Sequence, residues 1–409
     1  MAAQAVNVEP IVGWLDEGAP PARRPQDVLQ QLCHRLIDLG IPLYRVAVFV
    51  RTLHPNALGR GFIWNEKSNI VEVTTAALGI QDTEQFLKSP VRVVFTEHIA
   101  IRRRIEGSKG PLEFPILEDL REEGATDFLA LPVRFISGDV HAASFTTRRP
   151  GGFGDEELEA LRRIMPAFSR IAEIYSWRRT AHNILDAYLG EQTGEKVLAG
   201  QIRRGDGEDI HAVIWFCDLR DSTPLADSMS RADFLRLLNE FFECILGPVL
   251  EHKGEVLRFI GDAALAIFPA PQGDRLDRAE ASRRAVQAAR QAIERMAALN
   301  AKRERPLAFG IGLHLGHVLY GNVGTPTRIE FTVVGAAANE AARIESLCKT
   351  LGVPLLLSEP VARHVAGCRS LGLHRLRGVG DPVELFTLEE LARELAPEFA
   401  PEFVPKARQ

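Results

Sequence analysis

Two stretches in the second half of the chain constrain its fold and chemistry most strongly. Residues 212–223 (AVIWFCDLRDST) begin as an apolar run typical of a buried strand, and the run ends at Asp218. Residues 255–268 (EVLRFIGDAALAIF) predict a β-hairpin with Gly261 and Asp262 at its tip. One strand-end aspartate is equally typical of a simple turn. Two of them, joined by one long predicted helix, could meet around a pair of metal ions.

The polar turn after Asp218 predicts the start of a helix. Thr223 followed by Pro224 has the pattern of an N-cap and a first helical residue. Backbone N–H groups at a helix start point outward and favour phosphate groups. Thr223 is therefore a candidate substrate-binding residue.

Composition places the chain among globular proteins and excludes some functions. Its 409 residues favour two domains, and 46% hydrophobic with 25% charged residues is ordinary for such proteins. A net charge of −5 gives no general nucleic-acid footprint, and no apolar run has the length of a membrane span. Five cysteines without a CxxC pair suit a reducing compartment, and no signal-peptide pattern is visible. We therefore expect a cytoplasmic protein that binds neither nucleic acid nor membrane.

The first half of the chain predicts a regulatory domain. Residues 1–24 look irregular, and residues 25–39 have helical spacing. Strands follow, and the stretch LPVRFISGDVHAASFTTRRPGGFGDEELEAL has the pattern of a closing hairpin and an exit helix. This order resembles a GAF-like sensor domain over residues 25–154. The resemblance implies either a small ligand in this domain or a ligand-free dimerisation module, and the sequence leaves both open.

Residues 155–204 are predicted to be a helical, coiled-coil-like connector. Apolar residues from Leu158 to Tyr175 recur every three or four positions, as in a coiled-coil seam. The alternative is that this face packs on the N-terminal domain. Pro166 lies inside the run and is expected to kink the helix or begin a new one.

The remaining residues predict an alternation of helices and strands. Long helices are expected over 230–253 and 277–302, a second hairpin over 309–321, a strand over 330–335 and a helix over 336–350. Strands near 354–357 and 384–387 would complete this domain. Residues 391–409, with several prolines, are expected to be a disordered tail.

Five motifs in this half occur in the order seen in one enzyme family. VIWFCDLRDST, GEVLRFIGDAALAIF, FGIGLHLGHVLYGNVG, FTVVGAAANEAARIESL and LRGVGDPVELF resemble the catalytic domains of class III adenylate and guanylate cyclases. The resemblance covers residues 205–390. It implies an α+β fold, an α/β sandwich of the ferredoxin-like type, and the conversion of a nucleoside triphosphate to a cyclic nucleotide and pyrophosphate.

The resemblance also implies a metal site. Attack of the ribose 3′-OH on the α-phosphate requires a lowered hydroxyl pKa and neutralised phosphate charge, which two Mg²⁺ ions can supply. Asp218 and Asp262 match the family's two metal-binding aspartates, and the Leu219 carbonyl matches its backbone ligand. Mn²⁺ is expected to substitute for Mg²⁺.

Further residues match the family's substrate-binding positions. Asn339 matches the residue that orients the ribose, and Arg343 the residue that stabilises charge in the transition state. Arg377 stands where a phosphate-binding lysine is common. In the family these groups and the metal aspartates belong to opposite halves of a head-to-tail dimer, so we expect a homodimer with two shared sites.

The base-selecting positions depart from the usual pairs. Arg258 occupies a position that is Lys in many adenylate cyclases and Glu in guanylate cyclases, and Thr332 occupies the partner position. Absence of a Glu/Cys pair favours ATP and an adenylate cyclase, with a guanylate cyclase as the alternative. Asp221 and Ser222 stand where Gly-Phe is common. A carboxylate near the phosphates adds repulsion, so a catalytically weak nucleotide-binding or dimerisation module is a further alternative.

Overall fold

The computed structural model describes residues 6–392, and its contacts divide the chain into two compact units at Ala187 and Tyr188. Both units combine packed helices with mainly antiparallel sheets, so the chain is an α+β protein as predicted. Within residues 6–392, no helix combines the length and apolar character that a membrane span requires. The sequence assigned residues 155–204 to a connector, whereas the division falls near the end of one long helix, α6 (Asp155–Leu189).

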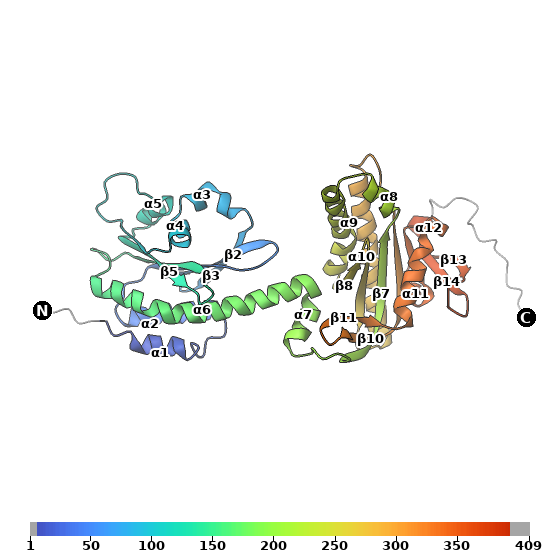
Figure 1. The fold of residues 1–409 in the computed structure, drawn as a ribbon, viewed down its shortest axis with the longest axis horizontal. Coiled ribbons are helices and arrows are strands. Elements are labelled where there is room, and N and C mark those ends of the chain that lie inside the picture. Colours follow the sequence, from blue (N-terminus) through green and yellow to red (C-terminus); the bar gives the residue numbers. More distant parts are fainter. Residues whose placement is uncertain (1–5, 393–409) are drawn as a thin grey trace, which may run out of the picture. The chain divides into compact units, whose positions relative to one another are not determined.

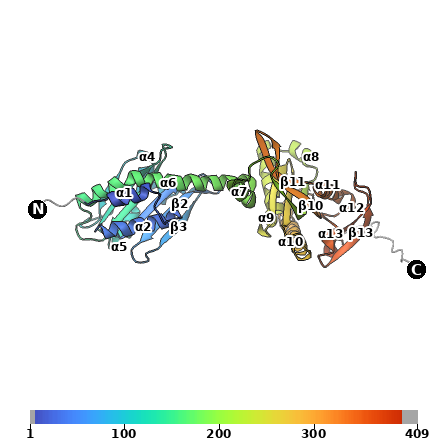
Figure 2. The ribbon, with the colours of Figure 1, turned by 90° about the horizontal axis from the view of Figure 1, so that it is seen from below.

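The first unit is built on a six-stranded sheet with the order β3-β2-β1-β6-β5-β4. One face is covered by α1, α2 and α6, and the other by α4 and α5 (Figures 1 and 2). The elements before α6 are α1 (Glu9–Asp16), α2 (Pro25–Asp38), β1 (Arg45–Arg51), β2 (Ala57–Asn65), β3 (Val71–Ala77), α3 (Glu84–Leu87), α4 (Pro90–Glu97), β4 (Ile101–Arg104), α5 (Pro115–Glu122), β5 (Asp127–Arg134) and β6 (Val140–Thr147).

One prediction for this unit is wrong, and one open alternative is decided. Residues 1–24 are not irregular throughout, because α1 buries Ile11, Trp14 and Leu15 in the core. The apolar face from Leu158 to Tyr175, for which a coiled coil and packing on the N-terminal domain were both open, packs in or against that same core, so the second alternative holds. Pro166 lies within α6 without ending it.

The second unit contains an eight-stranded sheet with the order β13-β14-β12-β10-β7-β9-β8, and β11 pairs with β10 outside this path. Its elements are α7 (Glu191–Leu198), β7 (Gly207–Leu219), α8 (Ser222–Asp227), α9 (Arg231–Glu251), β8 (Glu255–Ile260), β9 (Ala263–Ala270), α10 (Arg275–Asn300), β10 (Phe309–Thr325), β11 (Arg328–Val334), α11 (Ala336–Ser346), α12 (Cys348–Leu351), β12 (Leu355–Ser358), α13 (Glu359–Ala362), β13 (Cys368–His374), β14 (Val383–Leu388) and α14 (Glu389–Ala392).

Alternation along β7 explains how this sheet is sandwiched. Val213, Trp215 and Cys217 face the core made with α9 and α10, whereas Ala212 and Ile214 face the opposite core, which includes β11 and α11 (Figure 1). Both faces of the strand are therefore buried, which is why its sequence is continuously apolar.

Three expectations for the second unit need correction. The predicted hairpin over 309–321 is one long strand, β10, which turns back only after Thr325 to pair with β11. Strand β13 was not predicted. The expected disordered tail begins within α14, and its remainder, residues 393–409, lies outside the described residues.

Candidate active site

The two predicted metal-binding aspartates lie together at one end of the second unit's sheet. Asp218 is near the end of β7, and Asp262 lies in the tight turn between β8 and β9. Antiparallel pairing sets Asp218 opposite Ala263, and the Leu219 N–H donates to the Asp262 carbonyl oxygen at 3.3 Å. The pKa of Asp218 is raised, first by partial burial and then by the neighbouring Asp262 charge.

Arg220 and Glu345 extend this acidic cluster, and neither was singled out from the sequence. One guanidinium nitrogen of Arg220 lies 3.6 Å from the Asp218 carboxylate, and the group also forms an ion pair with Glu345. Burial raises the pKa of Glu345 to about 7; Arg220 opposes this shift, and the Asp218 and Asp262 charges add to it. The available signal was a glutamate on the buried face of a predicted helix, which usually has a buried cationic partner.

The donor set fits a hard divalent cation. Two carboxylates and a backbone carbonyl at Leu219 are oxygen ligands of the kind that Mg²⁺ prefers. Burial is the main reason that the pKa of Asp218 is raised, and the repulsion from Asp262 that adds to it is what a bound cation would relieve. Residues 6–392 hold no group of three or more His, Cys, Asp or Glu side chains arranged around a metal position, so further ligands would come from water and substrate.

The turn after the carboxylates differs from its prediction. Helix α8 begins at Ser222 with Asp221 at the N-cap position, so Thr223 lies inside the helix, exposed, and is not the N-cap. Asp221 has a left-handed backbone (φ 52°), a conformation that aspartate tolerates better than most residues. Its carboxylate accepts a hydrogen bond from Lys349 at 3.0 Å, which offsets the extra negative charge of this turn.

The two predicted base-selecting residues lie on facing strands. A bulge at Leu257 interrupts the pairing of β8 with β9 and sets the direction of Arg258. Arg258 forms an ion pair at 3.2 Å with Glu330 of β11. Thr332 is two residues further along β11, on the same side of the strand, and its buried hydroxyl has no hydrogen-bond partner. An unsatisfied buried hydroxyl is uncommon and is consistent with a ligand partner.

Helix α11 carries the predicted ribose and transition-state residues. Asn339 is exposed, and Arg343 is one turn further along the same face. Glu345, which contacts Arg220, lies on the opposite face of this helix. The Arg343 guanidinium approaches Gly378, so Arg343 and the segment of Arg377 are neighbours, and Arg377 is exposed.

Glycines on β10 allow α11 to lie directly against the strand. A Cβ atom on Gly312 would come within 2.6 Å of the Ala341 carbonyl oxygen and the Glu345 amide nitrogen. The space beside Gly316 is likewise occupied by the Ala337 side chain. These contacts fix the helix and thereby the position of Glu345 beside Arg220.

The structure therefore groups the predicted residues in three places: the two aspartates with Leu219, the Arg258–Thr332 strands, and Arg343 with the Arg377 segment. Residues 208–367 match the family described as the adenylate and guanylate cyclase catalytic domain. These residues form a class III nucleotide cyclase domain. Its mixed fold of sheets and helices agrees with that of the family.

Two proteins similar to this chain come from mycobacteria. An uncharacterised Mycobacterium tuberculosis protein is 39% identical over 206 residues, 48% of this chain and 35% of the relative. An uncharacterised Mycobacterium bovis protein is 34% identical over 239 residues, 57% of this chain and 40% of the relative. The chain thus spans well under half the length of these two relatives.

Solved cyclase structures are similar to part of the chain. A bacterial light-regulated adenylyl cyclase is 27% identical and covers 45% of this chain and 92% of its own, with a TM-score of 0.39. A guanylyl cyclase, also 27% identical, covers 44% of this chain and 93% of its own, with a TM-score of 0.37.

Proposed function

We propose that this chain converts ATP to 3′,5′-cyclic AMP and pyrophosphate. The observation that carries the proposal is the pair of carboxylates, Asp218 and Asp262, held together at the strand ends of a cyclase domain. Mg²⁺ ions bound there, or Mn²⁺ in their place, would supply charge neutralisation and a lowered pKa for the ribose 3′-OH.

The other residues of the chain position the nucleotide. Arg343 is a permanently charged, planar group suited to the negative charge that develops on the phosphates, and Arg377 adds a second cation nearby. Asn339 would hydrogen-bond the ribose and orient its hydroxyl. Thr223, at the exposed start of α8, would contact the phosphates beside the carboxylates.

We further propose a head-to-tail homodimer with two shared sites. Within one chain, Asn339 and Arg343 lie on the face of α11 opposite Glu345, whereas Glu345 is the residue that meets the carboxylate cluster through Arg220. A second copy would bring its own α11 face to the carboxylates of the first. Two-fold symmetry then makes the two sites equivalent.

Base selection rests on Arg258 and Thr332. The unpartnered Thr332 hydroxyl can accept from the adenine 6-amino group, and Arg258 can donate to adenine N1. Guanylate cyclase activity is the second candidate, because the Glu330 carboxylate beside Arg258 could accept from guanine N1–H and the 2-amino group. Replacing Glu330 by Gln is therefore expected to lower any use of GTP more than the use of ATP.

The test is product formation by the purified full chain. We expect cyclic AMP and pyrophosphate in equal amounts from ATP with Mg²⁺ or Mn²⁺, and a loss of at least a hundredfold in Asp262→Asn. Asp227→Asn, which alters an exposed carboxylate at the end of α8, is the matched control and should stay active. Nucleotide bound without turnover would instead support the binding-module alternative, and cyclic GMP as the main product would support the guanylate cyclase.

A further inference from the structure

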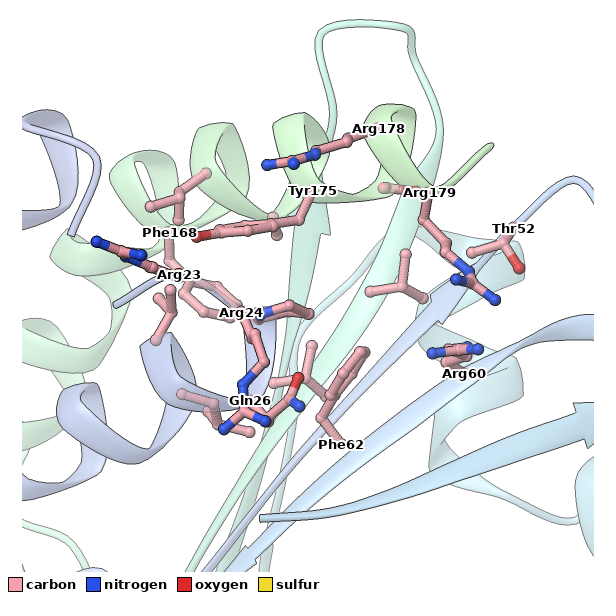
Figure 3. A pocket seen from close by; sticks show the side chains of 18 of the residues that line it. Arg23, Arg24, Gln26, Thr52, Arg60, Phe62, Phe168, Tyr175, Arg178 and Arg179 are labelled. Carbon is pink, nitrogen blue, oxygen red and sulfur yellow. The ribbon is translucent and has the colours of Figure 1, made fainter. Parts of the chain in front are cut away.

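The first unit contains a cavity that the cyclase chemistry does not use. It has a volume of about 380 Å³ and lies between α2, the strands β1 and β2, and the second half of α6 (Figure 3). This volume is within the range of small-molecule binding sites. All of the residues that line it belong to the first unit.

The inner wall of the cavity is apolar. Side chains of two helices and of the sheet form it: Val28 and Leu29 of α2, Phe168 and Ile171 of α6, Val48 and Val50 of β1, and Phe62 of β2. Most of them are buried members of the unit's core. A ligand with an apolar body would therefore lose water-exposed surface on entering.

The rim of the cavity is strongly cationic. Five arginines line it, Arg23, Arg24, Arg60, Arg178 and Arg179, together with His182. No aspartate or glutamate is among the lining residues. Among residues 6–392, only Arg24 of these five arginines forms an ion pair, with Asp27 beside the cavity.

Two of these arginines converge from different elements. Figure 3 shows Arg179 of α6 and Arg60 of β2 directed toward each other at one end of the cavity, with Arg23 and Arg24 on the side of α2. Burial, followed by the Arg179 charge, lowers the pKa of Arg60. Like charges held close together repel unless an anion lies between them. A guanidinium pair of this kind matches a carboxylate or a phosphate.

We propose that this cavity binds an amphipathic organic anion, with its carboxylate or phosphate head between Arg60 and Arg179 and its apolar body against the wall of α2, β1 and α6. A cationic ligand has no counter-charge in the lining, and a small inorganic anion would leave the apolar wall unfilled.

Such a ligand would link the sheet to α6. Arg179 lies on the last part of α6, which ends at Leu189, two residues into the second unit. An anion bound to both Arg60 and Arg179 would hold this part of the helix against β2. The anion is thus a candidate input signal for the cyclase domain, although its binding is independent of the cyclase reaction.

The test is calorimetric titration of the full chain with four probes: decanoate, decyl phosphate, 1-decanol and inorganic phosphate. We expect saturable binding of decanoate or decyl phosphate, and the stronger of the two identifies the head group. 1-Decanol and inorganic phosphate should bind at least tenfold more weakly. Arg179→Gln should weaken binding of the anion at least tenfold, whereas Arg162→Gln, an exposed arginine on α6 away from the cavity, should not.

A second variant separates binding from folding. Ala172→Leu fills the cavity from α6 without altering charge, and it should abolish binding while leaving the melting curve of the first unit in place. The proposal is overturned if neither anion binds, if 1-decanol binds as tightly as decanoate, or if Arg179→Gln binds as the parent chain does. It is also overturned if sedimentation shows that Arg179→Gln and Ala172→Leu both dissociate the dimer, because a second copy would then occupy this surface.

Discussion

Substitution of Tyr320 by Phe tests a buried hydrogen-bond network that holds α7 against the sheet of the second unit. The Glu255 carboxylate, at the start of β8, accepts from the Tyr320 hydroxyl at 2.7 Å and from the Thr193 hydroxyl at 2.6 Å and N–H at 3.1 Å. All three residues are buried. The Phe ring keeps the edge-to-face contact with Phe331, so only the hydroxyl is lost.

The expected cost follows from the charge of the acceptor. A hydrogen bond to a charged group contributes about 1.5–3 kcal/mol, and the carboxylate left behind has no water to replace the donor. We expect a loss of about 2 kcal/mol, equivalent to a roughly 30-fold larger population of the open state of this region. Hydrogen–deuterium exchange of the α7 and β8 peptides in the full chain measures this directly.

The matched control is Tyr188→Phe, which removes a hydroxyl from a tyrosine that is 83% exposed. It should leave exchange unchanged. Unaltered exchange of α7 in Tyr320→Phe, or an equal effect of the two substitutions, would refute the claim that this network holds α7 to the sheet.

Three further predictions concern stability. Gly312→Ala should cost about 2 kcal/mol or more, because its Cβ would meet the backbone of α11, whereas Gly380→Ala, with open space around it, should be nearly neutral in denaturant titration. Burial lowers the pKa of His141 to about 4, so the unfolded chain binds a proton that the folded chain does not. Stability of the first unit should therefore fall as pH drops from about 6.5 to about 4, and a flat pH profile of the melting midpoint, or the same slope in His141→Gln, would contradict this. Arg220→Met should destabilise the second unit by about 3 kcal/mol because Glu345 stays buried without a partner, and Arg220→Met with Glu345→Gln should recover most of that loss; no recovery in thermal unfolding would argue against the pair.

The sequence predicted local helices, strands and turns better than it predicted which elements pack against one another. The continuous apolar run of β7 and the Gly261–Asp262 turn were found because each depends on neighbouring residues alone. The seam of α6 shows the opposite case. Its spacing correctly indicated a buried face, but spacing cannot say whether that face packs on a second helix or on its own sheet.

Glycine in β10 misled for a physical reason. A hairpin was predicted over 309–321, yet Gly316 lies within one strand, where the absence of a side chain makes room for Ala337 of α11. The Arg220–Glu345 pair joins residues far apart in the chain, and the Asp221–Lys349 pair does the same. Neither pair has a local signature, so only the folded chain shows how the charges beside the candidate site are balanced.

The most direct test of the proposed enzyme is complementation between two inactive chains. Asp218→Ala removes a metal ligand and leaves the α11 face intact, whereas Arg343→Ala does the reverse. Each variant alone should make almost no cyclic AMP from ATP, and an equimolar mixture should recover up to about a quarter of the parent activity, because half of the dimers are mixed and each mixed dimer has one intact site. An inactive mixture, in which both variants are shown to form mixed dimers, would contradict the shared site.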